Sequence, residues 1–416
     1  MAHADIIVLG AGIVGTSIAV HLAKRGISVA LIDRGGPGEG TSYGNTGIIE
    51  GNTIFPQVFP SDWMALTRIA LKRAPEANYH ISFLPRVVPW LASFRAASQP
   101  ARLIETAQLM RPLFARAVAE HDALSAESGA EHYLSRRGWL KLYRTDRAFA
   151  AQAPELDLAA RWSIANVPLD REGAQALEPA LAGVFRRAVH WTGAVNVNNP
   201  LALTRAYAAR FAALGGLTFT GDARTLHRVH PYWRVDTAAG ALDAGDVVIA
   251  LGPWTGDVLA PLGIKLPLAV KRGYHRHFRP QANAMLSRPV LDAEKGYCLA
   301  PMEQGIRLTT GAEFAARDAP PTPVQFDRLL PAARGLFALG EPVENEPWMG
   351  SRPCFPDSRP VIARAPRQRG LWLAIGHGHW GLTLGPATGR LIAEMMTGAT
   401  PFCDPKPYSA DRFTQR

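Results

Sequence analysis

The chain has 416 residues, of which 45 are Lys or Arg and 35 are Asp or Glu, giving a formal net charge of +10 at pH 7. Its length predicts two domains, and its content of 47% apolar and 19% charged residues excludes extensive disorder. The cysteines Cys298, Cys354 and Cys403 lie far apart and lack zinc-ligand spacing. We therefore expect no disulfide framework and no metal site.

Location and partners are limited by the apolar and charge patterns. No apolar run reaches about 18 residues, and Asp5 precedes the first apolar run, so we expect neither a membrane span nor a secretory leader. This favours a cytoplasmic protein. Basic residues are scattered along the chain, which argues against a nucleic-acid partner. The positive charge suits an acidic ligand and also allows a peripheral contact with the inner membrane.

The first 33 residues have the pattern of a dinucleotide-binding unit. Residues 5–9 predict a buried parallel strand, residues 16–25 have helical spacing, and residues 27–32 predict a second strand. The glycines of Gly10-Ala-Gly-Ile-Val-Gly15 allow a tight turn, close approach of a pyrophosphate and close helix packing. Asp33 ends the second strand, where a carboxylate accepts hydrogen bonds from ribose hydroxyls. The predicted contacts are Gly10, Gly12, Ile13, Val14, Gly15, Asp33 and Arg34.

NAD(P) and FAD both use this unit, and later segments favour FAD. Residues 34–47 form a loop rich in Gly, Ser, Thr and Asn, which offers many donors to a long cofactor. Residues 247–255 and 371–385 each combine an apolar strand with a glycine turn, and a helix is predicted from Pro386 to Thr397. The N-terminus of such a helix can stabilise negative charge on a flavin. An NAD-only dehydrogenase has no need for this return of the chain.

Together these segments resemble the FAD-dependent D-amino acid oxidase-like superfamily, which includes glycine oxidases, sarcosine oxidases and bacterial D-amino acid dehydrogenases. The resemblance covers nearly the whole chain. It is closest to the D-amino acid dehydrogenases, because residues 63–95 look like their helical insertion. Asp33 stands where many members have Glu. The resemblance implies bound FAD and further contacts from Thr41, Ser42, Asn45, Thr46, Gly47, Gly252, Gly376, Gly378, Gly381, Leu382 and Thr383.

The resemblance also points to the residues that would bind an amino acid. Arginine binds a carboxylate through two hydrogen bonds, and Arg352, in Gly350-Ser-Arg-Pro, resembles the family's carboxylate-binding arginine. Tyr297 lies near the position of a family tyrosine that aids this binding, and packing suits it equally. The side chain of Tyr274 or of His275 could reach the pocket.

Beside the presumed flavin, His379 faces either the substrate or the neighbouring Trp380, and the sequence does not decide between them. The tryptophans Trp254, Trp348 and Trp380 are expected to pack in the protein rather than to stack on the cofactor.

The nucleotide motifs lie at the start, middle and end of the chain, so we predict a discontinuous Rossmann-type FAD domain of the α/β class. It comprises residues 1–89, 176–254 and 351–416. Residues 90–175 and 255–350 form an α+β substrate domain. In this domain Pro267 to Phe278 and Gly305 to Gly311 are predicted strands of an antiparallel sheet.

The reaction implied is oxidative deamination of a small amino acid, with hydride transfer from Cα to flavin N5. The favoured substrates are D-amino acids and cyclic imino acids such as D-proline or D-hydroxyproline, and the electrons pass to a quinone or to oxygen. One alternative is oxidation of an N-alkyl amino acid, as in sarcosine or glycine oxidases, where a covalent flavin link would fall to Cys354. Another is a flavin-carrying subunit of a hetero-oligomer.

Overall fold

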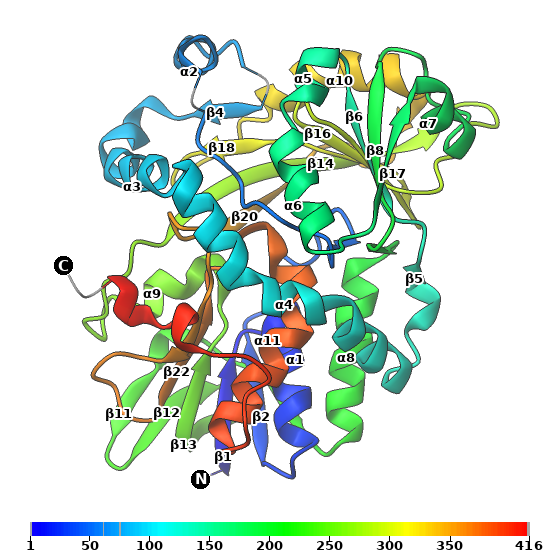
Figure 1. Cartoon of the computed structure of the whole chain (residues 1–416). Helices are drawn as coiled ribbons and strands as arrows, with labels where there is room; N and C mark the ends of the chain where they lie inside the picture. Colours follow the sequence, from blue (N-terminus) through cyan, green and yellow to red (C-terminus); the bar gives the residue numbers. More distant parts are fainter. Residues whose placement is uncertain (1, 61, 75, 414–416) are drawn as a thin grey trace.

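The protein is seen in a computed structural model that describes residues 2–60, 62–74 and 76–413 (Figure 1). Two large sheets, one above the other in Figure 1, each carry helices on their faces. The mixed α/β fold with a Rossmann-type half and a separate, mainly antiparallel half confirms the predicted class.

The lower sheet has the order β10-β2-β1-β13-β12-β11, with β22 and then β21 beside the second half of β13. Neighbouring strands among β10, β2, β1, β13 and β22 are parallel, while β11, β12 and β21 are antiparallel to their neighbours. Their apolar runs are buried, as a sheet covered on both faces requires. The strands are β1 Ala2–Leu9, β2 Val29–Asp33, β10 Leu217–Thr220, β11 His227–Val229, β12 Tyr232–Thr237, β13 Gly240–Ile249, β21 Val361–Arg364 and β22 Leu371–Ile375.

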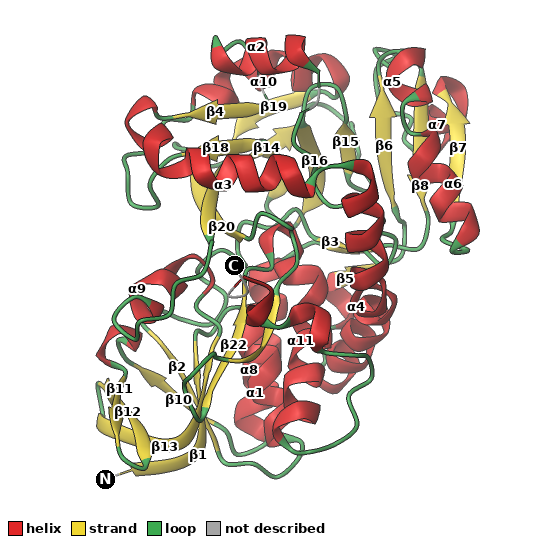
Figure 2. Ribbon diagram, turned by 60° about the vertical axis from the view of Figure 1, so that its left-hand side comes forward, coloured by secondary structure: helices red, strands yellow, loops and turns green. Residues whose placement is uncertain are grey.

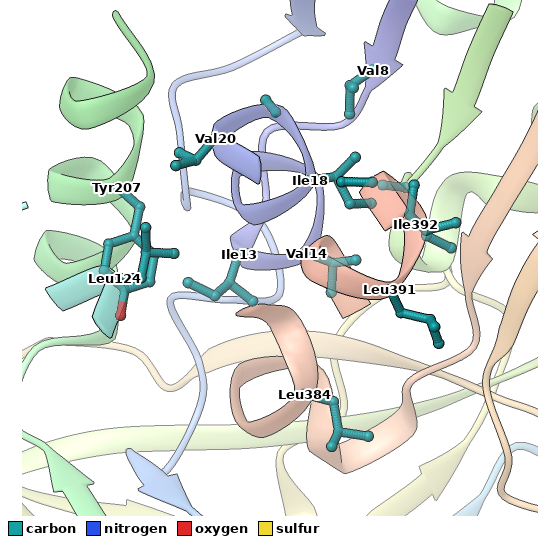
Figure 3. Close-up of a cluster of buried hydrophobic side chains, with 14 of the residues drawn as sticks. Val8, Ile13, Val14, Ile18, Val20, Leu124, Tyr207, Leu384, Leu391 and Ile392 are labelled. Atoms are coloured by element: carbon teal, nitrogen blue, oxygen red, sulfur yellow. The ribbon is translucent and has the colours of Figure 1, made fainter. Parts of the chain in front are cut away.

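One face of this sheet packs against α1, with α11, α4 and α8 around it (Figure 3). Residues 13–22 of α1 are all buried, because the helix is mainly apolar and is enclosed by these elements. Glycine allows the backbones of α1 and α11 to approach closely: a Cβ on Gly389 would lie 2.7 Å from the backbone of Ser17. The helices are α1 Ile13–Ala23, α4 Pro100–Glu127, α8 Pro200–Ala213 and α11 Gly381–Met396.

The upper sheet has the order β4-β18-β14-β17-β16-β15-β6-β8-β7, and β19 and β20 pair with β14 (Figure 2). It is antiparallel except for the pairs β4–β18 and β6–β15. Its apolar core includes residues of α10 Val324–Leu336 and α7 Arg171–Leu177. The two strands predicted here are observed as β14 and β17. The strands are β4 Ala77–Tyr79, β6 Trp139–Tyr143, β7 Asn166–Asp170, β8 Arg187–Trp191, β14 Ala269–Pro280, β15 Val290–Asp292, β16 Tyr297–Met302, β17 Gly305–Thr309, β18 Ala312–Phe314, β19 Leu339–Pro342 and β20 Trp348–Cys354.

The boundaries between the two halves of the structure differ from the predicted domain boundaries. The strands β4 and β8 belong to the upper sheet, although we assigned residues 1–89 and 176–254 to the FAD domain. The reason for β8 is its antiparallel pairing with both β6 and β7. Conversely, α4 packs in the lower half because its buried side chains, such as Met110, Leu113 and Phe114, join the cluster around α1 and α11.

Two helices, α2 Trp63–Ala70 and α3 Leu84–Ala97, occupy most of residues 63–95, and they lie beside the upper sheet in Figure 1. Among the described residues, no helix has both the length and the apolar character needed to cross a bilayer.

The helix α11 begins at Gly381, five residues before the predicted start, and includes Pro386. Proline lacks the N–H that would donate to the carbonyl of Leu382. In its place, His121 Nε2 on α4 contacts that carbonyl oxygen at 2.8 Å, while His121 Nδ1 lies 3.0 Å from the Tyr207 hydroxyl on α8. The imidazole therefore carries its proton on Nε2 and accepts from Tyr207 on Nδ1. A buried side chain from another helix thus completes the start of α11.

This contact predicts a specific dependence of stability on pH. Burial lowers the pKa of His121 to about 4, against about 6.5 for the unfolded chain. Between these values the unfolded state binds a proton that the folded state does not, so the free energy of unfolding falls as the pH is lowered from about 6.5 toward 4. In His121→Gln this titration is gone, and near pH 5.3 the slope should be smaller by about 1 kcal/mol per pH unit. Urea unfolding of both proteins from pH 7.5 to 4.5 measures the slopes, and equal slopes would contradict the assignment.

Candidate active site

A cavity of about 540 Å³ lies between the two sheets. Its wall contains the carboxyl ends of the parallel strands β1, β2, β10, β13 and β22, which is where open α/β sheets bind ligands. Across the cavity, the wall is made by β14, β17 and β20 of the upper sheet. The structure brings most of the predicted residues to this wall: Gly10, Gly12, Ile13, Val14, Asp33, Arg34, Thr41, Ser42, Asn45, Gly252, Tyr274, Arg352, Gly376, Gly378, His379, Gly381 and Leu382. The other predicted residues, Gly15, Thr46, Gly47, Tyr297 and Thr383, lie outside it.

The glycines of the first turn are required by the backbone around them. Gly10 has φ of +104°, a conformation that side chains disfavour, and its Cβ would lie 2.5 Å from the Ala250 carbonyl oxygen. A Cβ on Gly15 would lie 1.8 Å from the carbonyl oxygen of Gly10. Gly15 therefore packs against the side of the turn that faces away from the cavity, while Gly12 forms the N-cap of α1 at the cavity wall.

The glycine-rich loop at 34–47 is fixed to both halves of the protein. Ser42 Oγ accepts a hydrogen bond from the Ile13 N–H at the start of α1 (3.0 Å), and Thr41 Oγ1 donates to the Ser351 carbonyl on β20 (2.9 Å). On the upper sheet, Arg307 Nη1 donates to the carbonyl oxygens of Tyr43 (2.9 Å) and Asn45. The loop is therefore a preorganised part of the cavity wall.

Two of the predicted cofactor residues outside the wall hold neighbouring backbone in place. Gly47 has φ of +72°, and its Cβ would lie 2.0 Å from the Val197 carbonyl oxygen. Thr383 Oγ1 donates to the carbonyl of Ile48 (3.1 Å) and accepts from the N–H of Glu50 (3.3 Å). Both residues support the chain that leaves the glycine-rich loop.

The acidic residues of the cavity wall gather at one end. Asp33 ends β2, Glu39 and Asp222 lie in the loops after β2 and β10, and Asp257 lies in α9 (Thr255–Leu259), while Arg34 and Arg224 line the same end. Asp33 accepts hydrogen bonds from the N–H groups of Ala11 (2.7 Å) and Gly35 (3.0 Å), which fixes its carboxylate at the end of β2. The opposite end holds Arg352, His275, His377 and His379. A ligand with a ribose near Asp33 and an anionic group near Arg352 matches these two ends of the cavity.

Arg352 is the cationic residue at the end of the cavity opposite Asp33. Its Nη1 donates to the carbonyls of Gly311 (3.2 Å) and Arg272 (3.4 Å), and within the described residues no carboxylate lies within 4.0 Å of its guanidinium. Burial lowers its pKa, although the guanidinium keeps its charge at neutral pH. The neighbouring Arg272 differs, since its guanidinium pairs with Glu313 at 2.6 Å. Arg352 therefore offers an unpaired cationic group to the cavity.

The imidazole side chains of His377 and His379, near Arg352, are neutral at physiological pH. Burial lowers the pKa of His377 to about 4. Burial, together with the charges of Arg352 and Lys271, holds the pKa of His379 well below its usual range. His379 is part of the cavity wall, and its Nε2 lies 3.1 Å from Gln57 Nε2.

Lys271 is a second buried cation at this end. Its ammonium lies over the rings of Phe94 (4.2 Å) and Trp90 (5.0 Å) of α3, and no hydrogen bond or ion pair to it is formed within the described chain. Burial lowers its pKa. The helical insertion therefore contributes an aromatic enclosure for a cation next to Arg352.

The two predicted tyrosines point away from the cavity. The Tyr297 side chain lies in the core of the upper sheet, with its hydroxyl donating to the Ala332 carbonyl (3.2 Å). Tyr274 is part of the wall, but its hydroxyl donates to Glu313 (2.7 Å) and accepts from the Thr322 N–H (2.8 Å). Because side chains alternate along a strand, His275 faces the cavity instead.

Several wall residues were missed by sequence reasoning. Trp254 and Trp348, which we expected to pack in the protein rather than to stack on the cofactor, line the cavity. Gly221 to Arg224 follow the parallel strand β10, and this position was the signal that could have found them. Thr309 carries no motif, and only its pairing with His275 brings it to the wall. Within the described chain, no group of three or more His, Cys, Asp or Glu side chains is placed to hold a metal ion.

The fold and the site define a Rossmann-type oxidoreductase with a separate substrate sheet. The profile of the FAD dependent oxidoreductase family, DAO, matches residues 5–395, and the chain belongs to this family. It is therefore an FAD-dependent oxidoreductase.

Relatives match over nearly the full chain. A D-amino acid dehydrogenase of Rhizobium johnstonii is 30% identical over 425 residues, covering 98% of this chain and 99% of that protein. A glycine oxidase of Pseudomonas aeruginosa is 30% identical over 409 residues, covering 97% and 98%. Among solved structures, glycine oxidase from Geobacillus kaustophilus has a TM-score of 0.75 at 23% identity, with both chains covered completely. L-proline dehydrogenase from P. horikoshii has a TM-score of 0.75 at 20% identity, covering 100% and 98%. These structures share the fold.

The residues present fit FAD. Gly10 and Gly12 bring backbone without side chains to the cavity, and the N-termini of α1 and α11 lie at it, with the Ile13 N–H held by Ser42 Oγ. The positive end of the α11 dipole suits the negative charge of a reduced flavin. Asp33 is placed to hold a ribose, and the loop at 34–47 to hold the extended middle of the cofactor.

Proposed function

We propose that this protein oxidises a small amino acid at the bond between Cα and nitrogen, with a D-amino acid or a cyclic imino acid such as D-proline as substrate. The observation that carries this proposal is Arg352, a cavity-facing guanidinium that has no carboxylate partner among the described residues. Such a group binds a substrate carboxylate through two hydrogen bonds. The names of the relatives, which include D-amino acid dehydrogenase and glycine oxidase, support the same class.

FAD, when bound, supplies the acceptor for the hydride that leaves Cα. The protein's own residues orient the substrate and set its protonation. Arg352 fixes the carboxylate, and the neutral imidazoles of His275 and His379 add no charge. The nearby cations Arg352 and Lys271 disfavour a protonated amine, and this favours the neutral amine that reacts. The product is an imino acid, which hydrolyses to a 2-oxo acid and ammonia or remains as a cyclic imine.

Turnover with an artificial electron acceptor tests this proposal. The purified single chain should reduce the acceptor with D-amino acids and form the 2-oxo acid, and it should be inactive with the L-enantiomers. Activity only with N-methyl amino acids would replace the proposal by sarcosine-type oxidation. Activity that requires a second polypeptide would instead identify a flavin subunit of a larger assembly.

The covalent flavin link of the sarcosine-type alternative finds no support at Cys354. Its thiol lies outside the cavity wall, 3.5 Å from the Arg352 carbonyl, and burial raises its pKa. We expect FAD to be released when the protein is denatured and precipitated, and yellow colour remaining with the precipitate would contradict this.

For the electron acceptor, we propose a quinone reached by peripheral contact with an anionic membrane. The helices α2 and α3 and the chain between them expose large apolar side chains together with basic ones. The apolar set is Trp63, Met64, Leu71, Ile81 and Val88, and the basic set includes Arg68, Arg73, Arg86 and Arg95. Exposed apolar side chains with basic neighbours are typical of segments that lie in the interface of an anionic membrane.

Sedimentation with vesicles tests the membrane contact. The protein should bind vesicles that contain phosphatidylglycerol, bind pure phosphatidylcholine weakly, and lose binding at high salt. The double variant Trp63→Ser, Leu71→Ser should bind at least about tenfold more weakly, since each change removes apolar surface from the interface. Met285→Ser is the matched control, because Met285 is 78% exposed and lies outside this patch. Equal binding by all three proteins would refute the contact, and oxygen would then be the proposed acceptor.

A further inference from the structure

The substrate end of the cavity is formed by three adjacent strands, with β14 between β17 and β20. In their register His275 lies opposite both Thr309 and Trp348, Gly273 lies opposite Gly350, and Lys271 lies opposite Arg352. Residues 271, 273 and 275 face the same side of the sheet because side chains alternate. Thr309, His275 and Trp348 therefore form one row across the strands, and Lys271 and Arg352 another.

The row between these two rows consists of Gly273 and Gly350, and the absence of side chains there leaves space for Arg352 and Trp348. A Cβ on Gly273 would lie 2.2 Å from Arg352 Nη1, so the guanidinium lies over Gly273, on the side of His275. A Cβ on Gly350 would lie 2.3 Å from the Trp348 ring. The His275 ring stacks on Trp348 at 4.8 Å between centroids. Arg352 and His275 therefore face the same small space.

His275 and Thr309 have unused hydrogen-bonding capacity in this space. Both side chains are buried, at 1% and 6% exposure, and both line the cavity. Among the residues that the structure describes, neither ring nitrogen of His275 has a hydrogen-bond partner, and the Thr309 hydroxyl has none either. A buried polar group without a partner is costly, and native proteins rarely leave one. The hydroxyl of Tyr274, on the other face of the same strand, has three partners.

Charge limits what this pair can bind. Burial, aided by the charges of Arg307, His277 and Arg352, lowers the pKa of His275, so its ring is neutral and presents one donor and one acceptor. Arg307 is already occupied by the Tyr43 and Asn45 carbonyls and by His277 Nε2 at 2.9 Å. A cationic group is repelled here. Arg352 and Lys271, which have no carboxylate partner among the described residues, both belong to the other row of side chains. A neutral hydroxyl, which both donates and accepts, matches the pair.

We propose that His275 and Thr309 form a subsite for a hydroxyl on the substrate side chain or ring, so that the enzyme prefers hydroxylated amino acids over their hydrocarbon counterparts. This inference rests on the proposed function. The Arg352 guanidinium lies over Gly273, which is two residues along β14 from His275, a span of about 6.6 Å at about 3.3 Å per residue. When Arg352 binds the substrate carboxylate, His275 and Thr309 therefore lie near a substituent beyond Cβ of the substrate. The α-amine is bonded to the same carbon as the carboxylate, so it stays closer to Arg352.

Anaerobic reduction of the bound flavin by matched substrates tests the subsite. D-Homoserine is compared with D-norvaline, and 4-hydroxy-D-proline with D-proline. In the native enzyme the hydroxylated member of a pair should be favoured at least about tenfold in the ratio of limiting rate to dissociation constant. His275→Phe keeps the stack on Trp348, and Thr309→Val keeps the volume. Each should bring this ratio to within about twofold of unity.

Tyr274→Phe is the matched control, because it removes a hydroxyl from the opposite face of β14 and should keep the native preference. A native enzyme that reduces its flavin equally with both members of each pair would overturn the subsite and leave the proposed function intact. A preference that survives in both His275→Phe and Thr309→Val would overturn it as well. Flavin that no amino acid reduces would refute the proposed function and this inference together.

Discussion

Replacing Arg352 with methionine should lower kcat/KM for the amino acid substrate by roughly 10²- to 10³-fold, mainly through KM. The reason is the loss of a guanidinium that faces the cavity and, in the part of the chain that the structure describes, has no carboxylate partner. Methionine has a similar length and no charge. Steady-state kinetics with an artificial acceptor measures the loss, and the visible spectrum of the purified variant reports whether FAD is retained.

Stability separates a substrate-binding role from a structural one. Arg352→Met removes a cation without a counterion, so we expect the free energy of unfolding to be no smaller than that of the native protein. Arg272→Met is the matched control, since Arg272 is fully buried and pairs with Glu313 at 2.6 Å. Its loss leaves a buried carboxylate and should cost about 3–5 kcal/mol. An Arg352→Met variant with native KM would exclude Arg352 from carboxylate binding.

The second large effect is expected from Gly15→Ala, which should yield protein without bound FAD. The added Cβ would lie 1.8 Å from the Gly10 carbonyl oxygen, so the turn that approaches the pyrophosphate must open. The destabilisation should be about 3 kcal/mol, at the upper end for overpacking, because two backbone segments collide rather than two side chains. The ratio of visible to ultraviolet absorbance measures FAD content, and urea unfolding measures stability.

Gly335→Ala serves as the control for this change. Gly335 lies inside α10 with no heavy atom within 4 Å of an added Cβ, so the variant should retain FAD and gain about 0.5–1 kcal/mol. A Gly15→Ala protein with a full complement of FAD would show that the turn tolerates a side chain, against the geometry.

The nucleotide half could be predicted because its signals are local. The strand at 5–9, the glycines Gly10 and Gly15 and the carboxylate Asp33 follow one another within 33 residues, and each has one physical task. The apolar runs at 247–250 and 371–375 were recognisable for the same reason. The start of α11 was misplaced because proline normally marks a helix start, whereas here His121, distant in sequence, supports the carbonyl that Pro386 leaves free.

The substrate end depends on pairing between distant segments. Thr309, His275 and Trp348 meet only because β17 and β20 flank β14 in one register. Whether Tyr274 or His275 faces the cavity depends on which face of β14 is covered by the core, and the sequence around them does not give this. Likewise, β8 was assigned to the wrong half because its pairing with β6 spans a helical segment.

The most direct test of the proposed reaction is anaerobic reduction of the bound FAD, followed at its visible absorbance. We predict that a D-amino acid bleaches the flavin of the native enzyme completely, that its L-enantiomer does not, and that Arg352→Met requires a far higher concentration of the same D-amino acid. Flavin that dithionite bleaches but no amino acid of either configuration does would contradict the proposed function.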